Sequence, residues 1–218
     1  MSDPLIVVVG AGPGLGASVA RRFGREGYAV ALISLDADPL EELGTTLQGE
    51  GITTGWTPVD ITDEQALSEA ITRFGGFTGA IDVLHFNPSA FRQKDPLHLT
   101  PDELLDDVRL GVGSLLTALQ AARPFMSEGA RVTATGSMAA DQPWNEAASL
   151  GVQKAALRNL VRSIDATLEP DGIRAVSLTV NGTLAPGTAF SHDQVADALF
   201  RAANQPTEGW QAEVTYDG

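Results

Sequence analysis

A glycine-rich turn near the start of the chain has the residue types and spacing of an anion-binding loop. The apolar run Leu5-Ile-Val-Val-Val9 leads directly into Gly10-Ala-Gly-Pro-Gly-Leu-Gly16, and an amphipathic stretch follows. Gly10 permits the sharp bend, Gly14 lets the backbone approach a diphosphate, and Gly16 lets a helix pack closely on a strand. A structural turn also needs glycine, but the helix N-terminus offers N–H donors, and the order strand, turn, helix favours dinucleotide binding.

This turn belongs to an alternation of strands and helices along the whole chain. Short runs rich in β-branched residues alternate with longer amphipathic stretches, the pattern of parallel strands joined by helices. The sequence predicts an α/β fold of Rossmann type, with a doubly wound, seven-stranded parallel sheet and helices on both faces, three layers in all. The predicted strands lie near residues 5–9, 29–34, 52–57, 81–86, 130–135, 173–180 and 211–216.

Local signals mark the ends of the predicted helices. Gly27 ends the first one, and Thr100-Pro-Asp-Glu103 has the spacing of a capping box. Proline at a first helical turn and an acidic N-cap mark two further starts. Helices are expected over residues 14–26, 101–122 and 146–168, from Pro39 and from Asp63, and near Asp193.

Length, composition and charge limit the class of protein. The 218 residues, 43% of them hydrophobic, suffice for one large core and show no linker, so one domain over residues 1–218 is predicted. Fourteen Lys and Arg against 28 Asp and Glu give a formal charge of −14, which disfavours nucleic acid and membrane surfaces as partners. Cysteine is absent, the three histidines lack metal-ligand spacing, and the first apolar run is too short for a signal peptide. We expect a cytoplasmic protein without a metal site.

Further landmarks follow the glycine turn in a fixed order. Val59-Asp60-Ile61 comes after the third predicted strand, and Asp82-Val-Leu-His-Phe-Asn-Pro-Ser89 includes the fourth. Ser137 follows the fifth, and Gln153-Lys154-Ala-Ala-Leu157 lies in the second long helix. In order and spacing these landmarks resemble the short-chain dehydrogenase/reductase family over nearly the whole chain.

That resemblance implies an Asn-Ser-Tyr-Lys active site. In the family the tyrosine transfers a proton at the substrate oxygen, the serine orients that oxygen, and the lysine lowers the tyrosine pKa and holds the nicotinamide ribose. Ser137 and Lys154 stand at the serine and lysine positions, but Gly111 stands at the asparagine position and Leu150 at the tyrosine position. Because leucine cannot transfer a proton, a divergent member of the family without the catalytic tyrosine is predicted.

Few side chains could replace the missing phenol. Imidazoles change charge near neutral pH, so His192, after the sixth predicted strand, joins Ser137 and Lys154 as a candidate catalytic residue. An exposed loop histidine has the same sequence signature. Tyr28 starts the second strand and cannot reach the site, whereas Tyr216 could reach only the site of a neighbouring subunit.

The resemblance also implies which residues contact a nicotinamide dinucleotide. Position 34 does not carry the acidic residue that favours NAD, and position 35 does not carry the arginine that favours NADP. Ser34 can hydrogen bond to either form, and Asp36 and Asp38 disfavour a phosphate only weakly, so the choice between NADP and NAD stays open. Asp60 and Ile61 are expected at the adenine. The candidate cofactor-binding residues are Gly10, Pro13, Gly14, Leu15, Gly16, Ser34, Asp60, Ile61, Asn87, Pro88, Lys154, Gly182 and Thr183.

Two functions remain open at this point. One is an NAD(P)-dependent oxidoreductase that reduces a carbonyl or imine of a small-molecule substrate with an atypical or weakened active site. The other is a dinucleotide-binding sensor or partner protein without turnover. About a dozen residues separate the sixth strand from the last helix, so the substrate-covering region is shortened and the pocket is shallow or completed by another subunit. In this family the two long helices usually form dimer contacts, which implies a homodimer or homotetramer.

Overall fold

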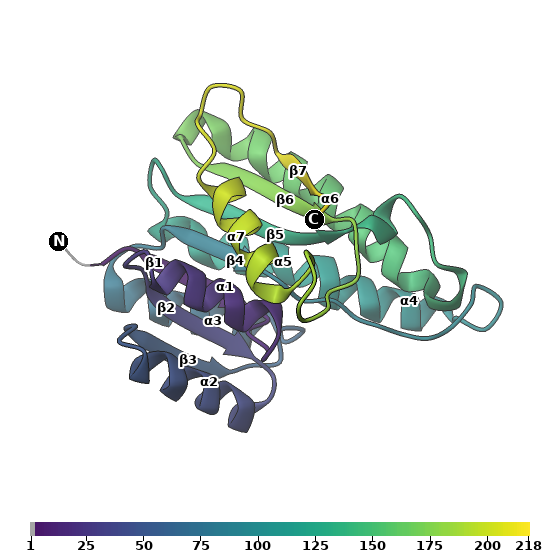
Figure 1. Cartoon of the computed structure of the whole chain (residues 1–218), viewed down its shortest axis with the longest axis horizontal. Coiled ribbons are helices and arrows are strands. Elements are labelled where there is room, and N and C mark those ends of the chain that lie inside the picture. Colours follow the sequence, from purple (N-terminus) through teal and green to yellow (C-terminus); the bar gives the residue numbers. More distant parts are fainter. Residues whose placement is uncertain (1–2) are drawn as a thin grey trace.

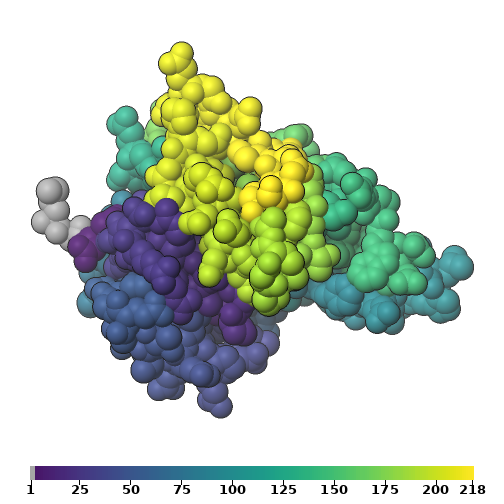
Figure 2. Space-filling view, in the orientation of Figure 1, coloured from purple at the N-terminus to yellow at the C-terminus, as the bar shows by residue number. Residues whose placement is uncertain are grey.

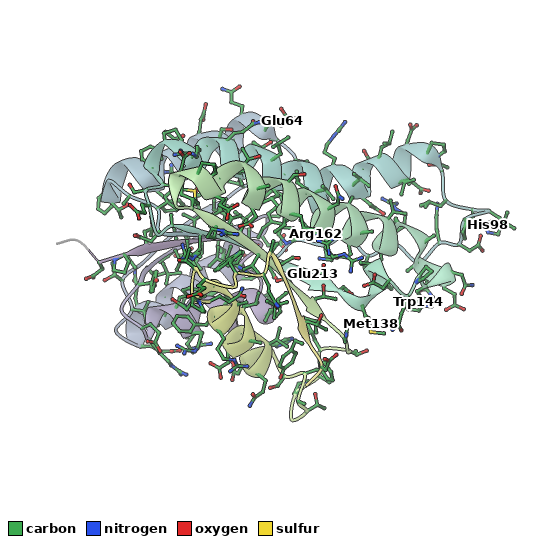
Figure 3. All side chains as sticks on the ribbon, turned by 90° about the horizontal axis from the view of Figure 1, so that it is seen from above. Glu64, His98, Met138, Trp144, Arg162 and Glu213 are labelled. Carbon is green, nitrogen blue, oxygen red and sulfur yellow. The ribbon has the colours of Figure 1, made fainter. Side chains whose placement is uncertain are left out.

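The computed structural model describes residues 3–218 as one parallel sheet between two layers of helices (Figures 1 and 3). Within this range the seven strands pair in the order β3-β2-β1-β4-β5-β6-β7, and every pair is parallel. The predicted Rossmann-type sheet is therefore confirmed. The strands are β1 (Leu5–Val9), β2 (Ala29–Ser34), β3 (Thr54–Pro58), β4 (Val83–Phe86), β5 (Arg131–Ser137), β6 (Arg174–Val180) and β7 (Glu213–Tyr216).

Helices cover both faces of the sheet. Helices α3, α5 and α6 bury their apolar residues against one face, and α1, α2 and α7 against the other. From β1 the sheet extends to β2 and β3 on one side and to β4 through β7 on the other, so the direction of winding switches between β1 and β4. At such a switch point a crevice forms beyond the carboxyl ends of the strands. The helices are α1 (Leu15–Gly24), α2 (Ala37–Gly49), α3 (Glu64–Thr78), α4 (Pro101–Val108), α5 (Ser114–Ala122), α6 (Ala148–Leu168) and α7 (His192–Ala203).

The first strand, β1, shows why its sequence is an uninterrupted apolar run. Leu5, Val7 and Val9 pack into the core beneath α3, α5 and α6, while Ile6 and Val8 pack into the core beneath α1, α2 and α7. All five side chains are buried because both faces of the strand are covered. β1 therefore offers no polar side chain to a ligand, and polar groups come from the turn that follows it and from other elements.

The predicted helix ends agree in part with the structure. Asp63 caps α3 by accepting a hydrogen bond from the amide of Ala66, and Thr100 and Glu103 form the expected capping box of α4. Helix α2 begins at Ala37 rather than Pro39, because Asp36 is its N-cap residue. The predicted helix over 101–122 is divided by a π-helical turn, η1 (Arg109–Gly113), which separates α4 from α5.

The segments after β4 and after β5 project together from one side of the body, beside α4 (Figure 2). The guanidinium of Arg92 binds both carboxylate oxygens of Asp107 at 3.1 and 3.0 Å, and Lys94 donates to Glu103 at 2.5 Å. Ser149 of α6 also donates to Asp107, at 2.7 Å. These bonds fix the segment that follows β4 against α4 and α6. No helix within residues 3–218 is long and apolar enough to cross a bilayer.

Candidate functional site

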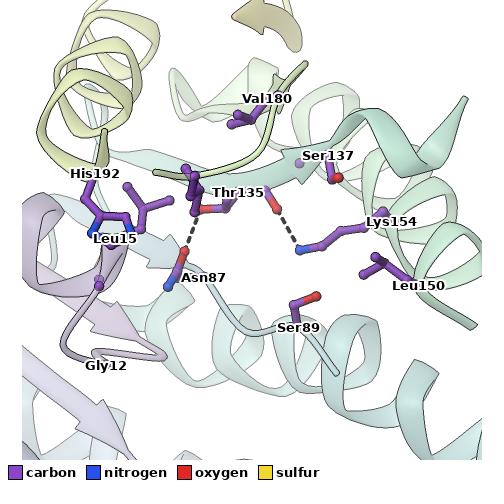
Figure 4. Close-up of a pocket in the computed structure, with 15 residues that line it drawn as sticks. Gly12, Leu15, Asn87, Ser89, Thr135, Ser137, Leu150, Lys154, Val180 and His192 are labelled. Atoms are coloured by element: carbon purple, nitrogen blue, oxygen red, sulfur yellow. Dashed lines mark hydrogen bonds between the residues drawn. The ribbon is translucent and has the colours of Figure 1, made fainter. Parts of the chain in front are cut away.

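A cavity of about 410 Å³ opens at the carboxyl ends of β1, β4, β5 and β6 (Figure 4). It is bounded by the glycine turn, by the segment after β4, by the first half of α6 and by the start of α7. The sequence-predicted residues that line it are Gly14, Leu15, Gly16, Asn87, Ser137, Lys154, Gly182 and His192. The fold thus brings together side chains from five separate parts of the chain.

The glycine turn has the geometry of an anion-binding loop. Gly10 has a φ angle of 83°, and a Cβ atom at this position would lie 3.0 Å from the Pro88 ring. A Cβ atom at Gly16 would lie 2.5 Å from the carbonyl oxygen of Gly10. Within residues 3–218, the amides of Gly14, Leu15 and Gly16 have no hydrogen-bond acceptor. These three N–H groups at the start of α1 remain available to a bound anion.

Asn87 connects this turn to the neighbouring strands. Its amide group donates to the carbonyl of Gly10 at 3.1 Å and accepts from the hydroxyl of Thr135 on β5 at 2.8 Å. The next residue, Pro88, packs directly against Gly10. Asn87 and Pro88, both predicted as cofactor-binding residues, therefore fix the shape of the turn through their contacts with Gly10. Asn87 also lines the cavity.

Lys154 is the buried cation of the cavity. Its ammonium group donates to the carbonyl of Thr135 at 2.9 Å and to that of Pro88 at 3.4 Å, and the residue is only 4% exposed. Burial lowers the pKa of Lys154 to about 8, so the group is still charged at neutral pH. An ammonium has a third N–H, and Lys154 lines the cavity, so that donor is left for a ligand.

The same burial affects a histidine on β4. His85 is fully buried, and burial together with the nearby charge of Lys154 lowers its pKa to about 3. Its Nδ1 atom lies 2.8 Å from the hydroxyl of Thr133. His85 is therefore neutral at physiological pH and leaves Lys154 as the charged group at this end of the site.

Gln153, to which the sequence analysis assigns no role, supports the segment after β4 beside the cavity. Its side-chain amide is fully buried, donates to the carbonyl of Ala90 at 2.9 Å and accepts from the amide of Ala90 at 3.0 Å. A Cβ atom at Gly111 in the π-helical turn would lie 2.3 Å from the Gln153 Oε1 atom. The amide of Gln153 thus fills the space beside Gly111. Part of the signal was in the sequence, because Gly111 stands where the family has an asparagine and so leaves space beside it.

The end of the cavity near Lys154 carries hydroxyls but no phenol (Figure 4). Leu150, one helical turn before Lys154, lines the cavity together with Ser89 and Ser137. The hydroxyl of Ser137 accepts a hydrogen bond from the amide of Ala139 at 3.2 Å, so its proton is free to be donated. Polar contacts at this end therefore come from two serines and one ammonium.

His192 lies at the other end of the cavity. It is the first residue of α7, and Figure 4 shows its ring beside Leu15 and the glycine turn, across the cavity from Leu150. His192 and Leu150 thus line opposite ends of the same cavity. The reason is the short connection from β6 to α7, which starts the helix directly above the turn.

That connection, residues 181–191, is folded tightly. The Phe190 ring packs where a Cβ atom of Gly182 would lie, and it makes an edge-on contact with Tyr216 at 5.7 Å between ring centres. The Tyr216 hydroxyl donates to the carbonyl of Ala189 at 2.6 Å. The phenol of Tyr216 therefore binds a carbonyl of its own chain.

The remaining predicted residues lie outside the lining of the cavity. Ser34 ends β2, and Asp60 and Ile61 follow β3, on the other side of β1 from Lys154. Asp60 accepts hydrogen bonds from the amide and hydroxyl of Thr62, and these bonds lower its pKa. Pro13 and Thr183 also lie outside the lining and are exposed. Gly10 and Pro88, which form and support the glycine turn, lie outside the lining as well.

A family model described as short chain dehydrogenase matches residues 4–196. The chain belongs to this family. Among its relatives, the short-chain dehydrogenase/reductase SDRA of Arabidopsis thaliana is 26% identical over 193 residues, which cover 88% of this chain and 73% of the relative. This match and the family model identify an oxidoreductase of the short-chain dehydrogenase type.

Solved structures agree with the fold of the family. A dehydrogenase/reductase from Sinorhizobium meliloti superposes with a TM-score of 0.90 at 21% identity, covering 100% of this chain and 95% of that one. A short chain dehydrogenase from Burkholderia cenocepacia, crystallised in complex with NADP, superposes with a TM-score of 0.88 at 24% identity, covering 99% and 96%. At these identities the comparison establishes the common architecture.

The contact between Gly111 and Gln153 makes a testable prediction. We expect Gly111→Ala to destabilise the short-chain dehydrogenase by about 1–3 kcal/mol, because the new methyl group displaces a buried amide. Gly113→Ala is the matched control, since its Cβ atom would meet nothing closer than 3.9 Å. Urea unfolding followed by circular dichroism measures both. In the double variant Gly111→Ala with Gln153→Ala, the two costs should not add, and full additivity would contradict the contact.

Proposed function

We propose that this short-chain dehydrogenase binds NAD or NADP and reduces a carbonyl or imine of a small molecule, with an active site that lacks the tyrosine of the family. The observation that carries the proposal is the single cavity that joins the free amides of Gly14, Leu15 and Gly16 to the buried ammonium of Lys154. The first group suits a diphosphate, and the second suits a ribose hydroxyl.

The residues present fit the diphosphate and the nicotinamide ribose of such a dinucleotide. The unpaired amides of the turn would donate hydrogen bonds to the diphosphate, and Lys154 would bind the nicotinamide ribose. Ser34, Asp60 and Ile61 stand on the side of β1 where the adenosine half would extend. The NADP complex of the Burkholderia cenocepacia structure supports this assignment. When bound, the nicotinamide supplies a hydride for the reaction.

The chain's own residues then act on the substrate oxygen. The Ser137 hydroxyl, whose oxygen is already held by the amide of Ala139, orients that oxygen by donating a hydrogen bond. The Lys154 ammonium stabilises the negative charge that develops there. Leu150 shapes the pocket but transfers no proton, so the alkoxide formed from a carbonyl would take its proton from water. Loss of a positioned acid costs about 10²- to 10⁴-fold in rate, so we propose slow turnover, or a substrate that needs no protonation.

Binding is tested by titration with NADH and NADPH, followed by calorimetry and thermal unfolding. We expect at least one of the two to bind and to raise the melting temperature, because a ligand that binds only the folded state stabilises it. Gly12→Val should keep the fold, since a Cβ atom there meets nothing within 4 Å, but fill the cavity and weaken binding at least tenfold. Gly76→Val, equally unobstructed on the exposed surface of α3, should bind normally.

Chemistry is tested by restoring a phenol. We expect Leu150→Tyr to raise the rate of NAD(P)H-dependent reduction across a panel of aldehydes and ketones by about 10²-fold or more, because it places an acid one turn before Lys154. Leu150→Phe is the matched control, as it has the same ring without the hydroxyl. A parent that binds dinucleotide but shows no turnover on carbonyls or imines would be a binding protein instead of an enzyme.

We also propose that two copies pair through the outer surface of the α4, α5 and α6 layer. Three leucine and valine side chains are exposed there, namely Leu105 at 62%, Leu116 at 43% and Val152 at 47%. Light scattering should therefore give the mass of a dimer or tetramer, and Leu116→Glu should shift it toward the monomer. A monomeric wild-type protein would contradict this proposal.

A further inference from the structure

The imidazole of His192 lies over the glycine turn, at the opposite end of the cavity from Leu150 (Figure 4). Its Cε1 and Nε2 atoms are 3.3 Å from the point that a Cβ atom of residue 14 would occupy. Close approach of ring and backbone is therefore permitted by the glycine at this position. An anion bound to the amides of Gly14, Leu15 and Gly16 would meet the ring as well.

The position of this ring is fixed from two sides. The hydroxyl of Ser18 donates to Asp193 at 2.7 Å, and one turn further along both helices Arg22 donates to Asp197 at 2.5 Å. These bonds set the register of α7 against α1. On the other side, Phe190 packs against Gly182 and closes the connection that precedes the helix. The ring is thus placed by the fold before any ligand arrives.

The two ring nitrogens of His192 are free for a ligand, since neither forms a hydrogen bond within residues 3–218. Charged groups on the neighbouring elements already have partners. Asp193 accepts from Ser18, and the α1 arginines are paired with carboxylates. Across the cavity, Lys154 donates to backbone carbonyls. No carboxylate therefore competes with a bound phosphate for the imidazole.

We propose that His192 binds the diphosphate of the dinucleotide and makes the affinity for it depend on pH. This inference rests on the proposed function, whose cofactor supplies the diphosphate. An imidazole gains a positive charge as the pH falls, and a hydrogen bond from a charged donor to a phosphate oxygen is stronger than one from a neutral donor. Affinity should therefore be highest in mild acid and decrease as the pH rises.

The experiment is calorimetric titration with ADP-ribose between about pH 5.5 and 7.5. This probe carries the diphosphate without the 2′-phosphate of NADP, which would itself titrate in this range. Lys154, with a pKa of about 8, stays mostly charged, and His85, with a pKa of about 3, stays neutral. We expect the affinity of the wild-type protein to fall about tenfold across the range.

Two variants separate the role of the His192 ring from other causes of a pH-dependent affinity. His192→Gln keeps a hydrogen-bonding group without a titrating charge, so its affinity should be uniformly weak and independent of pH. His98→Gln, which changes an exposed histidine paired with Asp95 far from the cavity, should keep the wild-type profile. Melting temperatures show whether each variant is folded, and His192→Asn replaces His192→Gln if the latter is not.

The outcomes are distinguishable. A pH profile in His192→Gln equal to that of the wild type, or a flat profile in the wild type, overturns the role of His192 while leaving dinucleotide binding intact. A folded wild-type protein that binds none of ADP-ribose, NADH and NADPH at any pH overturns the proposed function and this inference together.

Discussion

The site depends on one buried ammonium held by two carbonyl oxygens. Lys154 of α6 binds the carbonyl of Thr135 on β5 and that of Pro88 after β4, so a single side chain ties a helix to the ends of two strands. Pro88 in turn packs against Gly10, and Asn87 joins the same glycine to Thr135. The turn that offers its amides and the cation that faces it are therefore parts of one bonded network, whose geometry is set by backbone positions.

This network accounts for how the site tolerates departures from its family. Gly111 has no side chain, and the amide of Gln153 occupies the space beside it. This amide accepts a hydrogen bond from the N–H of Ala90 and donates one to the carbonyl of Ala90. The segment that carries the Pro88 carbonyl is thereby still held. Leu150, by contrast, has no compensating partner among the residues that line the cavity. Gln153 therefore supports the segment after β4 through packing and hydrogen bonds, whereas Leu150 presents only an apolar side chain to the cavity.

The sequence predicts the parts of this molecule that depend on local pattern. The order of strands and helices, the glycine turn and the caps at Asp63 and Thr100 follow from local pattern along the chain. The presence of Ser137 and Lys154 in one cavity was implied by the resemblance to the family. The features that the sequence could not predict depend on how segments far apart in the chain pack against one another. The contact of residue 111 with residue 153, and the place of His192 above the turn, are set by how whole helices pack. Such packing has no signature within a short window of sequence.

The short connection after β6 changes what the end of the cavity near the glycine turn can do. Residues 181–191 are too few for additional helices over the cavity, and the contacts of Phe190 with Gly182 and Tyr216 fold them against the end of β7. The start of α7 consequently lies directly above the glycine turn. The end of the cavity near the glycine turn is therefore covered by the polar side chain of His192, whereas Leu150 and Ser137 line the opposite end. Under the proposed function, contacts at the glycine turn would stabilise the bound nucleotide, and only the opposite end would distinguish one substrate from another.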